Sequence, residues 1–126
     1  MKKIEIKHPE KKVSTGAYSA GVLVDGWLYV SGQGPLNLET GEVVAGSIEE
    51  ETFLTLSHVK KIVEAAKGSM DHIVKCTVHL ADINDFDRFN TVYASFFPGI
   101  KPARTTVQSV LSDGIKIEID AVAKIS

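Results

Sequence analysis

Apolar and polar residues alternate most regularly near the end of the chain. From Ile115 to Ile125 an isoleucine or alanine stands at every second position, mostly with charged residues between. A period of two is typical of a β-strand with one buried face. Residues 73–80 and 104–110 also read as strands. For residues 73–80 the pattern predicts a buried face made of four residues, Val74, Cys76, Val78 and Leu80.

A hairpin is indicated in the first third of the chain, after a short possible strand at residues 4–6. Two β-rich runs flank the dipeptide Asp25-Gly26, which is the sequence of a two-residue type I′ turn. Both faces of the hairpin carry apolar side chains, because Trp27 and Tyr29 alternate with Leu28 and Val30. We therefore expect burial on both sides of the sheet here. Residues 31–35 are expected to end the hairpin.

Helical spacing of apolar residues appears in two segments. Ser47 and Glu50 have the spacing of a capping box, and Gly68 is the expected C-terminal stop of that first helix. Its predicted buried stripe is Ile48, Phe53, Leu56, Val59, Ile62, Val63 and Ala66. The second helix is predicted from about residue 85 to residue 97, before Pro98-Gly99. Its predicted core face is Phe86, Phe89, Tyr93, Phe96 and Phe97.

The order of these elements predicts an α+β fold in a single domain over residues 1–126. Two helices can cover only one face of a sheet with five or more strands. The other face of the hairpin is also apolar, and a monomer has nothing left to cover it. We therefore expect a closed homo-oligomer whose sheets pack together, with small-molecule sites in the clefts between subunits.

Charge and composition exclude several classes of function. The 14 Lys and Arg residues against 16 Asp and Glu residues give a net charge of −2, which does not attract polyanions in general. Only Arg88 and Arg104 are arginines, so a nucleic-acid partner is not expected. No apolar run is long enough to span a membrane, and the N-terminus lacks the pattern of a signal peptide. We expect a cytoplasmic protein.

No metal or cofactor motif is present in the sequence. The single cysteine, Cys76, excludes a disulfide framework and reads as an unreactive core residue. The four histidines do not have ligand spacing, and we expect His58 and His72 at the surface or at helix ends and His79 as an ordinary strand residue. The sequence therefore predicts chemistry without a metal or a cofactor.

Arg104 is the first candidate for a binding residue. It follows Pro102-Ala103 at the start of a predicted strand, and a guanidinium suits a carboxylate because it donates two parallel hydrogen bonds. An ordinary surface ion pair is the competing interpretation. Glu118 points away from the isoleucine row of the last strand. If the last two strands pair, we expect Arg104 and Glu118 on the sheet face that the helices leave open.

Short motifs along nearly the whole chain carry a family resemblance. They are Gly16–Ser19, Val30–Pro35, Thr40–Glu42, Val59–Ala66, Ile73–Val78, Asn84–Phe86, Phe89–Tyr93, Pro102–Thr105 and Ile117–Ile119. Their order and spacing together resemble the RidA/YjgF family of reactive-intermediate deaminases, and the segments 17–21 and 97–104 look especially RutC-like. The resemblance implies a chorismate-mutase-like fold, a mixed sheet with two helices on one face, and a homotrimer with clefts between its subunits.

The resemblance also implies roles for individual residues. Arg104 corresponds to the arginine that binds the substrate carboxylate, and Glu118 to the glutamate associated with the catalytic water. Tyr18, Ser31 and Gly32 correspond to residues that border the ligand. Asn90 is a lesser candidate for substrate binding, and Thr106 for orienting the substrate. The implied reaction is cofactor-free hydrolysis of enamine or imine acids, such as 2-aminoacrylate, to 2-keto acids and ammonia.

Departures from the family pattern put the substrate in question more than the chemistry. Ala17 replaces a usual proline, Gly34 an aliphatic residue and Thr106 a frequent cysteine, and the loop at residues 110–114 is about one residue shorter. Three other functions remain open at this point. They are a RutC-like step of pyrimidine breakdown, a regulator that binds small carboxylates without turnover, and RNA cleavage, which the net charge disfavours.

Overall fold

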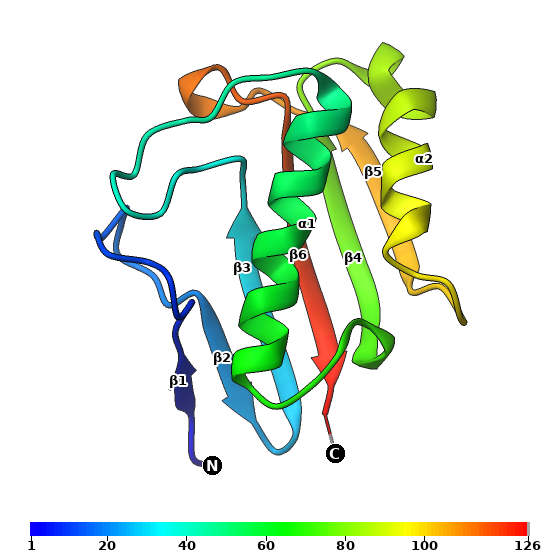
Figure 1. The fold of residues 1–126 in the computed structure, drawn as a ribbon. Coiled ribbons are helices and arrows are strands. Elements are labelled where there is room, and N and C mark those ends of the chain that lie inside the picture. Colours follow the sequence, from blue (N-terminus) through cyan, green and yellow to red (C-terminus); the bar gives the residue numbers. More distant parts are fainter. Residues whose placement is uncertain (126) are drawn as a thin grey trace.

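The computed structural model describes residues 1–125 and contains one six-stranded sheet with two helices on the same face (Figure 1). The last residue of the predicted domain, Ser126, lies outside the described residues. The strands are β1 (Ile4–Ile6), β2 (Gly21–Val24), β3 (Trp27–Gln33), β4 (Ile73–Leu80), β5 (Ala103–Gln108) and β6 (Ile117–Lys124). The helices are α1 (Ile48–Ala65) and α2 (Phe86–Ser95), with short 3₁₀ turns η1 (Met70–His72), η2 (Ile83–Asp85) and η3 (Ser112–Gly114). The predicted α+β class is confirmed.

The strands follow the order β1-β2-β3-β6-β4-β5 across the sheet. Only the β4–β5 pair is parallel, which makes the sheet mixed. Helix α2 connects these two strands, as a parallel crossover requires. The last two strands are not neighbours, because β4 lies between β5 and β6. The condition under which Arg104 and Glu118 would share a face is therefore not met.

Strand β6 has the alternation that the sequence predicts. The side chains of Ile117, Ile119, Ala121 and Ala123 are buried in the core that lies under α1. In β4 the pattern is interrupted by a shift of register between Ile73 and Lys75. A bulge of this kind changes which residues face inward, so Ile73 is buried and the predicted core residue Val74 is exposed.

The hairpin of β2 and β3 has the predicted turn. Both Asp25 and Gly26 have positive φ angles, 51° and 80°, as a type I′ turn requires. Strand β3 continues to Gln33 across an irregularity after Val30, so it ends within the predicted segment 31–35, and its pairing with β2 ends at Val30. Leu28 and Val30 are buried, but Tyr29 is 50% exposed on the opposite face. Within one chain, the expected burial on both sides is therefore absent.

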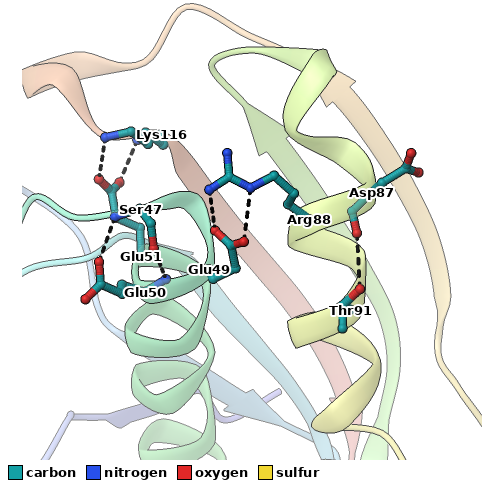
Figure 2. A network of polar contacts seen from close by, with 8 residues as sticks. All are labelled: Ser47, Glu49, Glu50, Glu51, Asp87, Arg88, Thr91 and Lys116. Atoms are coloured by element: carbon teal, nitrogen blue, oxygen red, sulfur yellow. Dashed lines mark hydrogen bonds and ion pairs between the residues drawn. The ribbon is translucent and has the colours of Figure 1, made fainter.

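Three successive glutamates in the first turn of α1 each bind a different partner (Figure 2). Glu50 completes the predicted capping box with Ser47. Glu49 holds Arg88 of α2, with contacts of 3.0 and 2.7 Å. Glu51 is buried and accepts hydrogen bonds from the backbone nitrogen and from Nζ of Lys116, at 2.8 and 3.1 Å. This ion pair links the start of α1 to the residue before β6, the strand that carries Glu118.

The remaining helix predictions need two corrections. Phe53 is 60% exposed rather than part of the buried stripe of α1, because it packs beside the Phe96 ring on the outside of the helix pair. Helix α1 does end near Gly68, but the residue with the left-handed backbone is Lys67, whose φ angle is 67°. In α2 the rings of Phe89, Tyr93 and the following Phe97 are buried as predicted. No helix within residues 1–125 is long and apolar enough to cross a membrane.

Candidate functional site

The predicted site residues fall into two separate groups. Tyr18, Ser31, Gly32 and Glu118 line one open cavity of about 590 Å³, here called the Glu118 cavity. It lies where β3 ends and β6 begins, between the segment 13–18 and the η3 turn. Arg104, Asn90 and Thr106 are absent from its lining. One protomer therefore presents the predicted site as two halves.

Glu118 lies directly over the backbone of Gly32. A Cβ atom at position 32 would come within 2.5 Å of Oε2 of Glu118, so any larger residue would displace the carboxylate. The neighbouring Ser31 donates from Oγ to the carbonyl of Ser19 at 2.6 Å, and its backbone nitrogen donates to the carbonyl of Ala20 at 2.9 Å. These bonds hold the Tyr18 segment against the end of β3.

Tyr18 is half exposed, and its ring is held by a lysine that sequence reasoning missed. Nζ of Lys11 lies 4.7 Å from the centre of the Tyr18 ring. It donates to the Tyr18 hydroxyl at 3.3 Å and to Oγ1 of Thr15 at 2.9 Å. The Tyr18 hydroxyl also contacts Oγ1 of Thr15. No sequence period marks Lys11, because it lies in a loop.

The second half of the site lies between β5 and α2. Nη1 of Arg104 donates to Oδ1 of Asn90 at 2.7 Å. Its guanidinium carbon lies 4.8 to 5.4 Å from the centres of three aromatic rings of α2, those of Phe86, Phe89 and Tyr93. Among residues 1–125 no carboxylate pairs with Arg104, whereas Arg88 is bound by Glu49. Arg104 is thus a cation with aromatic neighbours and donors left for an anion.

The expectation that Arg104 and Glu118 share the open face of the sheet is wrong. Arg104 is paired in parallel register with Cys76, and both side chains point toward α2. Glu118 alternates with the buried isoleucines of β6 and points to the opposite face. Thr106 lies on the Arg104 side of β5, and its hydroxyl is buried without a partner in the described part of the chain. In a single chain the two halves therefore face different sides.

Two titratable side chains that pack beside Arg104, those of Cys76 and Tyr93, have raised pKa values. Burial raises the pKa of the Cys76 thiol, which supports the prediction of an unreactive core residue. Burial likewise raises the pKa of Tyr93. His79 is a strand residue as predicted, with Nδ1 at 2.8 Å from Oγ of Ser109 and Nε2 at 3.8 Å from Oδ2 of Asp120. Because the Cys76 thiol and the Tyr93 phenol remain neutral near pH 7, the charge among these three packed side chains is that of Arg104.

The prediction that His58 lies at the surface or at a helix end is also wrong. His58 is only 8% exposed and His8 only 3%, and Nε2 of His8 lies 3.2 Å from Nδ1 of His58. The backbone nitrogen of Glu10 donates to Nδ1 of His8, so Nε2 of His8 carries the proton given to His58. His58 then donates from Nε2 to the carbonyl of Leu36 at 2.8 Å. Fifty residues of sequence separate the two rings, so no local motif indicated the pair.

The hydrogen bonds from His8 to His58 and from His58 to Leu36 hold one part of the Glu118 cavity wall in place. They connect the segment after β1 to α1 and to the loop after β3, and Leu36 of that loop lines the cavity. Burial lowers the pKa of His8 to about 4 and also lowers that of His58, so both rings are neutral near pH 7. Across residues 1–125 no three His, Cys, Asp or Glu side chains form a group that could hold a metal ion.

Comparisons with known proteins agree on one family. The sequence model described as Endoribonuclease L-PSP matches residues 9–125. A RutC family protein of Pyrococcus abyssi is 42% identical over 109 residues, which are 86% of each chain. The 2-iminobutanoate/2-iminopropanoate deaminase of rat is 44% identical over 109 residues, 86% of this chain and 80% of the rat protein. The structure of E. coli TdcF with bound serine has a TM-score of 0.89 and 36% identity, covering 98% of this chain and 99% of TdcF.

Proposed function

Because the chain belongs to the Endoribonuclease L-PSP family, to which the RidA, YjgF and RutC proteins belong, we propose that it hydrolyses 2-imino acids to 2-keto acids and ammonia. The rat relative is named as a deaminase of 2-iminobutanoate and 2-iminopropanoate. These molecules share a carboxylate beside an electrophilic C=N carbon. A protein for this reaction needs an anion-binding group and a positioned water.

The observation that carries this proposal is the set of contacts that Arg104 makes within the chain. A guanidinium beside three aromatic rings, with one neutral amide as its hydrogen-bond partner, is suited to receive a carboxylate from outside the chain. Asn90 orients the guanidinium of Arg104, and the unpartnered hydroxyl of Thr106 lies on the same side of β5. Each charge-assisted hydrogen bond to the substrate is worth about 1.5–3 kcal/mol.

Glu118 is the proposed general base. A water held by its carboxylate attacks the C=N carbon, and Glu118 carries one proton of this water to the nitrogen, which gives a neutral carbinolamine. Glu118 then carries the hydroxyl proton to the same nitrogen, the C–N bond breaks, and ammonia leaves as the hydroxyl oxygen becomes the keto oxygen. The reaction consumes one water and needs no cofactor. Positioning and one base account for the acceleration, of which the base supplies roughly 10²–10⁴-fold.

Because Arg104 and Glu118 face different sides of one protomer, the proposed site needs a second copy of the chain. The Arg104 half of one subunit meets the Glu118 cavity of its neighbour, and a homotrimer closes three such sites. The serine bound in E. coli TdcF has an α-carboxylate of the kind proposed here as the ligand of Arg104.

The test is a coupled assay in which a dehydratase generates 2-aminoacrylate and the release of pyruvate is followed. We expect acceleration by the wild-type protein, and Arg104→Ala should lower kcat/KM by roughly 10²–10⁴-fold, the value of two charge-assisted bonds. Arg104→Lys should recover little of this, because an ammonium cannot donate two parallel bonds. Arg88→Ala removes the other arginine and should leave the rate unchanged.

An unchanged rate in Arg104→Ala would refute this mechanism. Saturable binding of 2-oxobutanoate that depends on Arg104, without acceleration of imine loss, would identify a carboxylate-binding regulator instead. Thermal unfolding of each variant separates a lost contact from a lost fold.

A further inference from the structure

The wall of the Glu118 cavity beside Tyr18 is rich in hydroxyl groups, and a lysine that lines the adjoining cavity binds two of them. Thr15 and Tyr18 line the cavity, and both bind Nζ of Lys11. Two of the three ammonium hydrogens are used by these hydroxyls, and the third remains for a ligand. The positive charge therefore lies within hydrogen-bond distance of two atoms that belong to the cavity wall.

Among the described residues Lys11, like Lys12, has no acidic partner, in contrast to two other lysines of the chain. Lys61 pairs with Glu10 at 3.3 Å, and Lys116 pairs with the buried Glu51. No ion pair in the described part of the chain includes Lys11. The cavity itself contains the carboxylates of Asp113 and Glu118. Without Lys11, the field in this cavity would repel a second carboxylate on the substrate.

The backbone holds Lys11 in place on both sides. Its nitrogen donates to the carbonyl of His8 at 3.2 Å, and His8 is anchored to His58. The next nitrogen, that of Lys12, donates to the carbonyl of Leu38 at 2.8 Å. An ammonium on an anchored backbone, resting over an aromatic ring, loses less side-chain entropy on binding than a free surface lysine.

We propose that Lys11 makes the site selective for 2-imino acids whose side chain ends in a carboxylate, the imines of dicarboxylic amino acids. This inference rests on the proposed function. With the α-carboxylate on Arg104 of a neighbouring subunit and the reacting carbon beside Glu118, the substrate side chain extends along the remaining cavity wall. Lys11, Thr15 and Tyr18 supply the charge and hydrogen bonds that a terminal carboxylate needs there.

The experiment compares imines generated in situ by amino-acid oxidases from glutamate and from alanine. The measured quantity is the ratio of the two kcat/KM values. We expect the wild-type protein to favour the glutamate imine, and Lys11→Met to lower the ratio by roughly two- to fivefold, as for a partly exposed ion pair. Lys11→Glu should lower it further. Lys12→Met, the same change one residue later, should keep the wild-type ratio.

A second measurement does not depend on turnover. Calorimetry gives the dissociation constants of the keto-acid products 2-oxoglutarate and 2-oxobutanoate for the same variants. Weaker binding of 2-oxoglutarate alone in Lys11→Met supports the inference even if no imine is hydrolysed, in which case only the proposed reaction fails. If the alanine imine is hydrolysed but Lys11→Met changes neither the ratio of the kcat/KM values nor the ratio of the dissociation constants, the inference is overturned and the proposed function stands.

Discussion

The buried pair of His8 and His58 should make the folded state sensitive to acid. In the folded protein the pKa of His8 falls from 6.5 to about 4, because burial and the neighbouring ring disfavour its charged form. Lys11 and Lys61 lower it further, and only Glu10 opposes them. Between pH 6.5 and pH 4 the unfolded chain therefore binds more protons, so stability falls as pH falls through this window.

The free energy of unfolding, measured by urea titration at several pH values, should decrease by roughly 1–3 kcal/mol from pH 6.5 to pH 4 on account of His8. His8→Gln should be less stable at pH 7 and should show a shallower decrease over the same window. His72→Gln changes a histidine outside the pair and should keep the wild-type slope. Equal slopes in all three proteins would show that the pair does not titrate as described.

Single site residues could be identified from sequence only where a motif marked them. Arg104, Glu118, Tyr18 and Gly32 stand in short segments that resemble the family, and the structure supplies a physical reason for Gly32 in its close approach to Glu118. Lys11 and His8 lie in a loop without a period, and their partners come from distant or irregular segments. Contacts of this kind depend on the fold and leave no local pattern.

At the scale of elements, two structural roles that the sequence assigns to Gly68 belong to two adjacent residues at the end of α1. Lys67 has the left-handed backbone that glycine favours, and Gly68 has no positive φ angle. Gly68 is required for space, because a Cβ there would overlap Cδ1 of Ile125 and crowd Val63. Conformation and close packing therefore act on adjacent residues.

Lys67→Gly should stabilise the protein by about 0.5–1 kcal/mol. Glycine removes the energetic penalty that a non-glycine residue has in the left-handed region, but it also gives the unfolded chain more conformational freedom, and the net effect is the difference between the two. Gly68→Ala should destabilise it, because Ile125 must move. Chemical denaturation of both variants measures the two effects. A destabilised Lys67→Gly would mean that position 67 is not left-handed in solution.

The regular parts of the elements could be predicted, and their irregularities could not. Alternation in β6, the capping box of α1 and the Asp25-Gly26 turn each follow from residues close together in sequence. The bulge near Ile73 and the extension of β3 to Gln33 depend on pairing with β6. The pairing register has the same origin. Arg104 is in register with Cys76 and through it with Ala121, so Arg104 and Glu118 lie on opposite faces.

At the scale of the whole molecule, the sheet face opposite the helices presents an apolar row to solvent. Val22, Tyr29 and Val122 are cross-strand neighbours on β2, β3 and β6. Trp27 lies on the same face and is also exposed. Such a surface is typical of a subunit interface. The proposed homotrimer would bury it and bring the two halves of the site together.

If the proposed trimer is correct, light scattering should give a mass about three times the 13.6 kDa of one chain. Tyr29→Lys should reduce the mass and abolish imine hydrolysis, because the halves no longer meet. Phe53→Lys places the same charge on the helix side and should change neither. A wild-type mass of 13.6 kDa with full activity would contradict a shared site.

Mixing two inactive variants tests the shared site directly. Arg104→Ala retains a complete Glu118 cavity, and Glu118→Ala retains a complete Arg104 half. If each site takes one half from each of two neighbouring subunits, refolding an equal mixture pairs the two intact halves in about one quarter of the sites, by random assembly of a closed ring. Activity should therefore return to about a quarter of the wild-type value. A site built within one chain would stay inactive in every mixture, because no subunit carries both groups.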